Sequence, residues 1–351
     1  MNRHDVAIVG TGGIAAVHAQ DLAALGDRAR IVAAVDPDAD RLAGFAAQWQ
    51  VPGAYADLDA MLDAVKPGLV HLCTPPGLHA AQAIACLDRG VAVLCEKPPA
   101  CSLAEFDAIA AAARRGGTHF AVVSQHRFGG GAIQLRKLIA DGALGRPMTA
   151  VCHTLWYRPD AYFAVPWRGT WASEGGGPTM GHGIHQIDLL LSILGDWSEV
   201  VAVAARRARH TQTEDLSAAL VTFADGTVAT VVNSLLSPRE TSYLRFDFEH
   251  ATVELEHLYG YDSSNWRFTG PPDTWPAGGD ASGHRAQFAA VFDALDAGLA
   301  PPVSDARRTL DLIASIYASA FTGRPVRSGE IGPTSPFYAT MEGTGAPWAS
   351  A

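Results

Sequence analysis

Lys97 is the residue of this sequence whose type and surroundings most strongly suggest chemistry. It is one of three lysines among 26 basic side chains and stands in the segment Cys95-Glu96-Lys97-Pro98-Pro99, directly after an apolar run. A lysine ammonium is compact, can be desolvated and can pass a proton once its pKa shifts, whereas a guanidinium cannot. The placement favours a role in catalysis, with a chance lysine in a loop as the alternative.

A second group of candidate catalytic residues follows three consecutive glycines, between Glu174 and Asp188. The glycines allow the backbone to pass close to a ligand. If a helix begins near Gly183, then His182, His185 and Asp188 share one face near its first turns. His185 suits general acid–base catalysis because imidazole titrates near neutrality. Metal binding is the alternative, but the spacing is not a zinc signature and no cysteine supports it, so we expect no metal.

A third feature is an aromatic segment over residues 155–171, which also contains two prolines and a glycine. Such a composition argues against one regular element, and aromatic rings in an irregular loop can stack on the apolar faces of a sugar. A hydrophobic plug or a subunit contact is the alternative. The aromatic residues of this segment are Trp156, Tyr157, Tyr162, Phe163, Trp167 and Trp171.

The elements that precede and follow Lys97 alternate between apolar strands and helices. Continuous apolar strands separated by helical segments predict a parallel sheet covered on both faces, with ligands bound at the carboxyl ends of the strands. A shorter strand is expected near residues 54–56. The main predicted strands are Asp5–Gly10, Arg30–Asp36, Leu69–Cys73, Val91–Cys95 and His119–Ser124, and the helices are Ile14–Leu25, Ala39–Gln50, Leu78–Arg89 and Leu103–Arg115.

The turn after the first strand has the pattern of a dinucleotide-binding loop. Gly10 permits a tight turn, and Gly12 lets the backbone approach a pyrophosphate at the N-terminus of the following helix. Asp36 ends the second strand, where an acid can accept hydrogen bonds from ribose hydroxyls. Asp36 would repel a 2′-phosphate, so NAD is favoured over NADP, although the nearby Arg41 could reverse this preference. The turn residues predicted to contact the cofactor are Gly10, Thr11, Gly12, Gly13 and Ile14.

Two later strand ends are expected on the same cofactor-binding edge. The strand before Cys73 leads into Thr74 and Pro75, with His79 shortly after them. The strand before Cys95 leads into Glu96 and Lys97. We expect these residues to contact the cofactor, although His79 could instead cap or begin a helix.

From about Gly145 the pattern changes to strands joined by short turns, which predicts a largely antiparallel sheet. A helix around residues 183–194 should cover one face, and the other face could pair with a second subunit. Late helices at 285–297 and 305–321 could pack back onto the first domain. Residues 260–283 are interpreted as a loop and 328–351 as a weakly structured tail. The domains are therefore predicted as 1–125 and 126–351.

Composition excludes several classes of partner. The net charge of −10, without a Lys/Arg-rich tract, opposes binding to nucleic acid or to an anionic membrane surface. No apolar run reaches the ~18 residues of a membrane helix, and no signal peptide is recognisable, so we expect a cytoplasmic protein. Five cysteines without a C-x-x-C pair are interpreted as reduced core thiols.

With these motifs the chain resembles the glucose–fructose oxidoreductase / inositol dehydrogenase / rhizopine catabolism (Gfo/Idh/MocA) family. The resemblance extends from the glycine turn through Glu96-Lys97-Pro98 to the segment Gly175–Asp188. It implies an α/β Rossmann domain that binds NAD(P), followed by an α+β domain with an open, mostly antiparallel sheet that often mediates oligomerisation. A homodimer or homotetramer is therefore expected. Members commonly oxidise or reduce a secondary alcohol or carbonyl of a sugar, cyclitol or derivative.

By this resemblance Lys97 corresponds to the active-site lysine and His185 to the catalytic histidine. Arg127, Trp167 and Arg168 correspond to positions near the nicotinamide or the substrate, and we add Tyr157 of the aromatic segment to the predicted substrate site. One departure concerns the proton relay. Many members have an aspartate four residues before the histidine, where this chain has Gly181. The substitute could be His182, which we include among the catalytic candidates, or Glu174.

Three functions are compatible with these residues. The leading hypothesis is hydride transfer between nicotinamide and a carbinol carbon of a carbohydrate-like substrate. In this hypothesis His185 takes the hydroxyl proton and Lys97 stabilises the alkoxide. The alternative is that Lys97 is the base and His185 positions the substrate. A second hypothesis is redox-neutral glycoside cleavage by transient oxidation and elimination, in which His182 supplies the extra base. A third is a dinucleotide-binding protein without catalysis.

Overall fold

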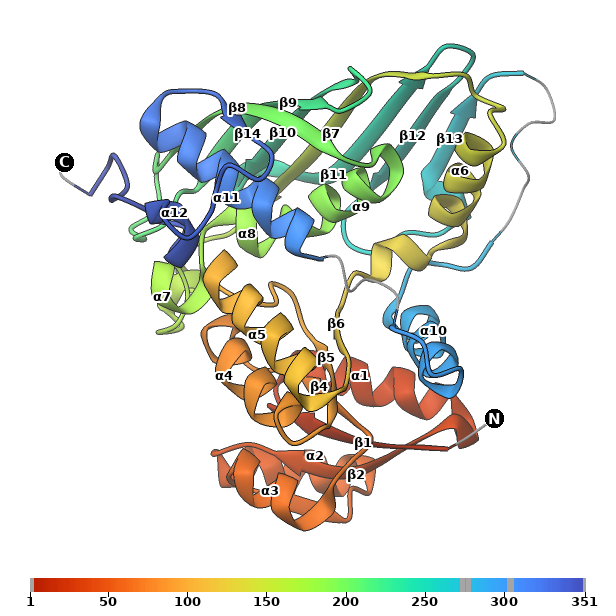
Figure 1. The fold of residues 1–351 in the computed structure, drawn as a ribbon, viewed down its shortest axis with the longest axis vertical. Helices are drawn as coiled ribbons and strands as arrows, with labels where there is room; N and C mark the ends of the chain where they lie inside the picture. The colour runs from red at the N-terminus through yellow and green to blue at the C-terminus, as the bar shows by residue number, and fades with distance from the viewer. Residues whose placement is uncertain (1–2, 272–274, 276–278, 302–305, 350–351) are drawn as a thin grey trace. The chain divides into compact units, whose positions relative to one another are not determined.

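The apolar runs of the first 125 residues form a six-stranded parallel sheet in the computed structural model, which describes residues 3–271, 275, 279–301 and 306–349 (Figure 1). The strand order β3-β2-β1-β4-β5-β6 reverses direction between β1 and β4. This reversal is the point at which doubly wound sheets bind their ligands. The strands are β1 (His4–Val9), β2 (Ala29–Val35), β3 (Gly53–Tyr55), β4 (Leu69–Leu72), β5 (Ala92–Cys95) and β6 (Phe120–Val122).

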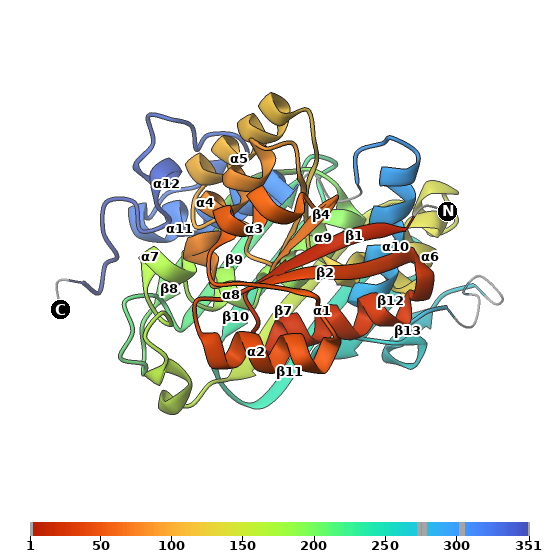
Figure 2. The same ribbon diagram turned by 90° about the horizontal axis from the view of Figure 1, so that it is seen from below.

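Helices cover both faces of this sheet, as the continuous burial of its central strands requires. Figure 2 shows α1 and α2 on one side of the sheet and α3, α4 and α5 on the other. The carboxylates of Asp38 and Asp57 accept backbone N–H groups at the starts of α2 and α3. The bounds are α1 (Gly13–Ala24), α2 (Ala39–Trp49), α3 (Leu58–Val65), α4 (Pro76–Leu87) and α5 (Leu103–Gly116), with a 3-10 turn η1 (Gly26–Arg28).

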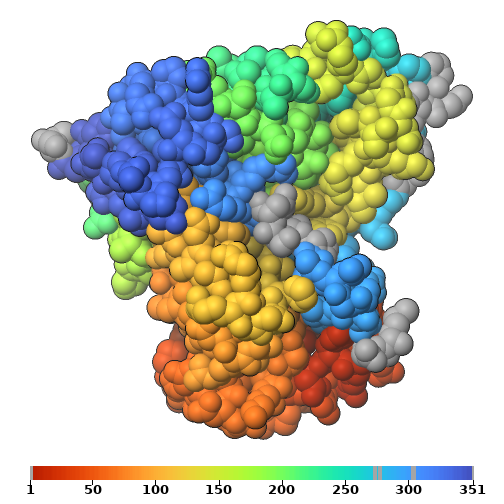
Figure 3. All heavy atoms as spheres, viewed as in Figure 1, coloured from red at the N-terminus to blue at the C-terminus, as the bar shows by residue number. Residues whose placement is uncertain are grey.

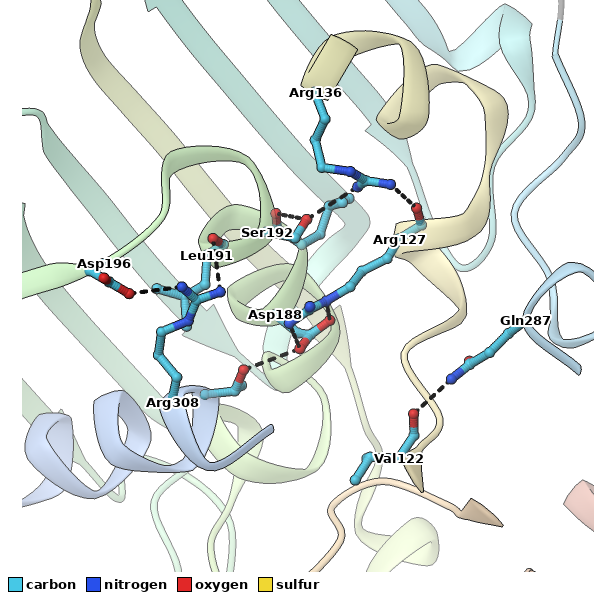
Figure 4. Close-up of polar contacts among 11 residues, drawn as sticks. Val122, Arg127, Arg136, Asp188, Leu191, Ser192, Asp196, Gln287 and Arg308 are labelled. Carbon is cyan, nitrogen blue, oxygen red and sulfur yellow. Dashed lines mark hydrogen bonds and ion pairs between the residues drawn. The ribbon is translucent and has the colours of Figure 1, made fainter. Parts of the chain in front are cut away.

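The chain divides into two compact units. Unit 1 comprises residues 1–100, 105–123 and 284–306, and unit 2 comprises residues 101–104, 124–283 and 307–351. Helix α10 (His284–Asp296) therefore belongs to unit 1, where its Phe288 and Phe292 are fully buried in the core of the parallel sheet. Gln287 of this helix also donates a 2.7 Å hydrogen bond to the carbonyl of Val122 (Figure 4). The second late helix, α11 (Ala306–Thr322), groups with unit 2 almost entirely.

Unit 2 contains an eight-stranded mixed sheet in the order β13-β12-β11-β7-β10-β9-β8-β14. Every pair is antiparallel except β7 with β10, so the expected open, mostly antiparallel sheet is confirmed. Its strands are β7 (Pro147–Tyr157), β8 (Trp197–Ala205), β9 (Leu216–Phe223), β10 (Val228–Ser234), β11 (Leu236–Phe248), β12 (Thr252–His257), β13 (Trp266–Thr269) and β14 (Val326–Arg327).

Helix α9 (Ile184–Leu194) packs against β7 and β11 on one face of this sheet. Most of its side chains are buried, which accounts for its largely apolar character between Asp188 and Leu194. On the other face Val201, Val203 and Leu220 are exposed, Val203 by 67%. The remaining elements are α6 (Gly130–Ala140), α7 (Trp171–Glu174), α8 (Pro178–Gly181), α12 (Pro336–Ala339), η2 (Gln125–Phe128), η3 (Asp160–Ala164) and η4 (Ser263–Asn265).

Two regions interpreted as irregular are more ordered than the sequence suggested. In the predicted loop 260–283, β13 pairs with β12, with Trp266 buried and Phe268 opposite Val253. In the predicted tail, Phe337 and Met341 are buried, and the C-terminal residues lie against α11 in the space-filling view (Figure 3). Sparse aromatic and aliphatic anchors between glycines and prolines are sufficient to order these segments, although they produce no periodic signal.

No helix in the described parts of the chain combines the length and the apolar character needed to cross a membrane.

Replacing Gly10 with alanine should lower the free energy of unfolding by about 2 kcal/mol or more. Gly10 has a φ of +83°, and an added Cβ would meet the Cys73 carbonyl at 2.9 Å. Gly12→Ala is the matched control, because its φ is −77° and nothing lies within 4 Å of the added Cβ. Urea unfolding of both variants measures the difference, and equal losses would contradict the steric explanation.

Candidate active site

The loop after β1 and the end of β2 form one connected structure in unit 1. The Asp36 carboxylate accepts hydrogen bonds from the backbone N–H and the hydroxyl of Thr11, both at 2.9 Å. The Arg41 guanidinium donates to both carboxylate oxygens, at 3.1 and 2.9 Å. Burial opposes ionisation of Asp36, but the hydrogen bonds from Arg41 and Thr11 lower its pKa to about 2. Asp36 is therefore an anion at physiological pH, paired with an arginine whose side chain is half exposed.

The N-terminus of α1 is suited to hold a phosphate group. Gly12 is its N-cap; no side chain caps the helix, and no acidic residue lies in its first turn. The space above Gly12 and Gly13 is open, since a Cβ at either position would have no neighbour within 4 Å. Uncapped N–H groups at a helix N-terminus attract an anion. These residues fit the pyrophosphate of a dinucleotide, with Asp36 placed to accept ribose hydroxyls.

His79 connects the two later strand ends. Its ring is fully buried, with Nδ1 2.8 Å from the carbonyl oxygen of Pro98 and Nε2 2.8 Å from that of Thr74. The residue lies in the first turns of α4, which begins at Pro76. A ring enclosed in this way has no surface to offer a cofactor. We therefore propose that His79 holds the two loops together, in place of the direct contact that the sequence suggested.

Lys97 lies two residues after the end of β5 and is partly buried. Its backbone N–H donates a 3.1 Å hydrogen bond to the carboxylate of Glu96, which is itself buried. Thr74 and Pro75 occupy the corresponding position after β4, the neighbouring strand. Unit 1 thus collects the predicted cofactor residues at the carboxyl ends of β1, β2, β4 and β5.

In unit 2, His185 lies in the first turn of α9 and within a group of rings. It stacks on His126 with ring centres 5.1 Å apart, and it meets the edge of Tyr259 at 5.2 Å. The Tyr259 hydroxyl accepts a 2.8 Å hydrogen bond from Gln125. His126, Gln125 and Tyr259 were not recognised in the sequence, because they come from η2 and from the segment after β12, which carry no local motif.

His182 lies three residues earlier, beside the aromatic segment. It is 5.2 Å from the ring of Trp156, and its Nε2 is 3.4 Å from the Tyr162 hydroxyl. The guanidinium of Arg168 covers Tyr162 at 3.9 Å and Trp167 at 4.3 Å from the ring centres. The structure therefore brings together His182, Trp167 and Arg168, three of the residues that were predicted for the substrate site.

Tyr157 does not join this group. Trp156 and Tyr157 are consecutive residues of β7, so their side chains point to opposite faces of the sheet. Trp156 is buried near His182, while Tyr157 is exposed and lies under the Arg209 guanidinium. Alternation along β7 thus places Trp156, and not Tyr157, beside His182.

Arg127 is engaged in an internal ion pair. Its guanidinium donates to both oxygens of Asp188 at 2.7 and 2.6 Å, and its side chain is only 12% exposed (Figure 4). Thr309 of α11 donates to the same carboxylate at 3.1 Å. We propose that Arg127 fixes α9 by this pair. The Asp188 carboxylate is thereby bound by Arg127 and Thr309. These internal contacts account for an aspartate at this position without a substrate contact or a metal ion.

Two of the three glycines before α8, Gly176 and Gly177, have an internal explanation that differs from the predicted approach of a ligand. A Cβ at Gly176 would lie 2.2 Å from the Tyr317 hydroxyl, and one at Gly177 would lie 2.0 Å from the backbone oxygen of Glu214. The Glu214 carboxylate accepts hydrogen bonds from the N–H groups of Gly177 and Thr179 and from the Tyr317 hydroxyl, at 3.0, 3.1 and 2.8 Å. Glycine is needed because this backbone passes directly over Glu214.

At Gly181 the structure leaves room for a side chain, since nothing lies within 4 Å of a Cβ built there. An aspartate at this position, as many family members have, would fit sterically. Glu174, one proposed substitute, makes an ion pair with Arg168 at 3.5 Å and accepts the backbone N–H of Gly169. Its charge is thus engaged within the aromatic segment.

The chain is similar to known proteins over nearly its whole length. Residues 4–124 match the family described as "Oxidoreductase family, NAD-binding Rossmann fold", and residues 132–254 match the GFO/IDH/MocA C-terminal domain. Both domains match in the expected order and together cover more than two thirds of the chain. The protein is therefore an oxidoreductase-family protein with an NAD-binding Rossmann domain. It belongs to the GFO/IDH/MocA family.

Two curated relatives and one solved structure illustrate the similarity. D-glucoside 3-dehydrogenase of Escherichia coli is 32% identical over 54% of this chain and 54% of its own length. D-apiose dehydrogenase of Paraburkholderia graminis is 28% identical over 67% of this chain and 60% of its own length. The WlbA dehydrogenase of Bordetella pertussis, crystallised with NADH and UDP-GlcNAcA, superposes with a TM-score of 0.84 at 27% identity, covering 93% of this chain and 99% of that one. The chain thus spans little more than half the length of these curated relatives.

Glu214→Gln should make the stability of the protein less dependent on pH. Burial raises the pKa of Glu214 from 4.5 to about 7 despite its hydrogen bonds. Because the folded state binds the proton more tightly, the stability that Glu214 contributes is full below pH 4.5 and is lost as the pH rises to about 7. This shift corresponds to roughly 3 kcal/mol. Glutamine does not titrate, so the difference in unfolding free energy between wild type and variant should shrink from pH 5 to pH 8.

Chemical denaturation at several pH values measures this difference. Asp311→Asn is a suitable control in the same unit, since burial raises the pKa of Asp311 as well but its carboxylate contacts neither α8 nor the three glycines. A constant difference between wild type and the Glu214 variant from pH 5 to pH 8 would contradict the assignment.

Proposed function

We propose that the protein is an NAD-dependent oxidoreductase that transfers a hydride between nicotinamide and a secondary alcohol or carbonyl carbon of a sugar, cyclitol or sugar derivative. The observation that carries this proposal is the edge of unit 1, where an uncapped helix N-terminus, an ionised Asp36 and Lys97 lie at the ends of neighbouring parallel strands. The activities of the similar proteins, a glucoside 3-dehydrogenase and an apiose dehydrogenase, support the same class of substrate.

The proposed mechanism assigns one role to each residue. NAD, when bound, supplies a hydride acceptor at nicotinamide C4. His185 takes the proton of the substrate hydroxyl, and the stacked His126 together with Tyr259 fixes the plane of its ring. Lys97 donates a hydrogen bond to the same substrate oxygen and stabilises the developing alkoxide. His182, Trp167 and Arg168 bind the sugar, with the aromatic rings stacking on its apolar face.

Lys97→Met and His185→Asn should each lower the rate of hydride transfer by at least about 100-fold, because each removes one proton-handling or charge-stabilising group. The affinity for NAD should remain within about threefold in His185→Asn, since His185 is not among the predicted cofactor contacts. A screen of sugars, cyclitols and glycosides with NAD identifies the substrate, and single-turnover absorbance of the reduced cofactor measures the rate. Wild-type rates in both variants would refute the mechanism.

A second candidate function is redox-neutral cleavage of a glycoside by transient oxidation and elimination. The observation that favours it is the presence of two histidines, His185 and His182, with Tyr162 3.4 Å from the second. Oxidation acidifies the neighbouring C–H bond, and elimination then requires a further base. Release of the aglycone without accumulation of NADH distinguishes this function from simple oxidation.

Asp36 and Arg41 provide a test of cofactor choice. In Asp36→Ser the carboxylate that repels a 2′-phosphate is removed, and Arg41 loses its ion-pair partner. The ratio of kcat/KM for NADP to that for NAD should rise by at least about tenfold, the effect of one charge-assisted contact. The double variant Asp36→Ser/Arg41→Ala is the control and should lose this gain. No change in the ratio would show that Arg41 does not reach the 2′-phosphate.

We further propose that the protein works in the cytoplasm as a homo-oligomer. Five buried free thiols suit a reducing compartment. The exposed apolar side chains Val201, Val203 and Leu220 on the outer face of the antiparallel sheet suit contact with a second copy. A homodimer or homotetramer that buries this face is expected by light scattering.

A further inference from the structure

Glu96, the residue before Lys97, lies at the centre of a buried polar cluster in unit 1. Its Oε1 is 2.9 Å from Nε2 of His18 in α1 and 3.2 Å from Nε2 of His284 in α10. Its Oε2 accepts the backbone N–H of Lys97 at 3.1 Å. His18 and His284 are both buried. Two imidazoles from opposite ends of the sequence are therefore connected to the backbone of Lys97 through one carboxylate.

The protons of the cluster can be assigned from these contacts. An ionised carboxylate only accepts, so His18 and His284 each present Nε2–H to Glu96. Nδ1 of His18 is 3.0 Å from Nδ1 of His71, and only one of these two nitrogens can carry the shared proton. When His18 is neutral, His71 is the donor. The cluster then consists of one buried negative charge and imidazoles that are oriented by it.

The shifts in pKa agree with this assignment. Burial lowers the pKa of His18 and lowers that of His71 further, which favours neutral rings. Burial opposes ionisation of Glu96, but the hydrogen bonds from His18 and His284 hold its pKa well below its usual range. The carboxylate thus stays ionised and accepts donors at both oxygens, which fixes its orientation.

The three side chains could alternatively hold a metal ion. The potential ligand atoms of His18, Glu96 and His284 lie within 4.8 Å of one another. However, both N···O distances are those of direct hydrogen bonds, and the second carboxylate oxygen is occupied by the Lys97 N–H. The hydrogen-bonded arrangement explains every contact of the carboxylate without an ion.

We propose that His18 and His284 are positioning residues for Lys97, and that they act through the carboxylate of Glu96. Both oxygens of Glu96 are fixed by donors, so the carboxylate in turn fixes the peptide unit from which the Lys97 side chain extends. Phe288 of α10 packs against the rings of His18 and His71, with centres 5.0 and 4.8 Å apart, and holds them in place. The proposal rests on the proposed function, in which Lys97 contacts the substrate oxygen.

Two substitutions at His284 separate positioning from packing. His284→Gln retains an N–H donor near the place of Nε2, whereas His284→Leu retains the volume but removes the donor. His284→Leu should lower single-turnover hydride transfer by at least about tenfold, while the NAD dissociation constant and the melting temperature change little. His284→Gln should stay within about threefold of wild type. If the role of His284 were purely structural, both substitutions would instead lower the melting temperature, and the rate of hydride transfer would fall with it.

The scarcity of lysine allows a second measurement that does not depend on activity. The chain has three lysines, Lys66, Lys97 and Lys137, so reductive methylation with 13C-formaldehyde gives one NMR signal for each lysine beside that of the terminal amine. The Lys97 signal is identified by its loss in Lys97→Met. It should shift or broaden in His284→Leu but not in His284→Gln, while the Lys66 and Lys137 signals stay unchanged.

The outcomes are distinct. If no polyol or sugar is turned over but the Lys97 signal responds, the proposed function fails and the positioning role stands. If both rate and signal in His284→Leu match wild type, the positioning proposal is overturned. It is also overturned if the purified protein holds one zinc ion per chain and if removal of this ion by a chelator abolishes the difference in the Lys97 NMR signal between His284→Leu and His284→Gln. Should His284→Leu not fold, Glu96→Gln, which cannot satisfy all three donors, must produce the same displacement of the Lys97 signal.

Discussion

A carboxylate removed from water must be surrounded by donors, and this requirement shapes both units of the protein. In unit 1 the carboxylate of Glu96 gathers two imidazoles and a backbone N–H at the end of β5. In unit 2 the carboxylate of Glu214 gathers two backbone N–H groups and a tyrosine hydroxyl before α9. Glu96 directly precedes Lys97, whereas Glu214 binds the backbone at Gly177 and Thr179, ahead of the helix α9 that carries His185. The two acids therefore fix the backbone at Lys97 in unit 1 and at the start of α8 in unit 2.

Much of the fold could be predicted because it depends on local patterns. The parallel sheet follows from apolar strands that alternate with helices, and the cofactor loop follows from glycines at Gly10 and Gly12 together with the acid at Asp36. These signals lie within about 30 residues of one another, the length of one βαβ unit. The antiparallel sheet likewise follows from strands joined by short turns, and Lys97 was singled out by its place directly after an apolar run.

The parts that sequence reasoning missed depend on distant partners. Nothing around His284 indicates that its ring meets Glu96, 188 residues earlier. Nothing near Gly176 indicates that Tyr317 passes within reach of its Cα. The prediction of Tyr157 did not take account of the alternation of faces along a strand, by which Trp156, and not Tyr157, lies beside His182. The ordered C-terminal segment was missed because its anchors, Phe337 and Met341, are too sparse to form a period.

The return of α10 to unit 1 has a consequence for synthesis of the chain. The core of the parallel sheet includes Phe288, Val291 and Phe292, which leave the ribosome after the whole antiparallel sheet up to β13. The dinucleotide-binding unit therefore cannot complete its hydrophobic core while only its N-terminal segments have been translated. This differs from domains that fold in order from the N-terminus. Until α10 is synthesised, the apolar side chains of α1 and of the sheet that α10 covers lack this packing partner.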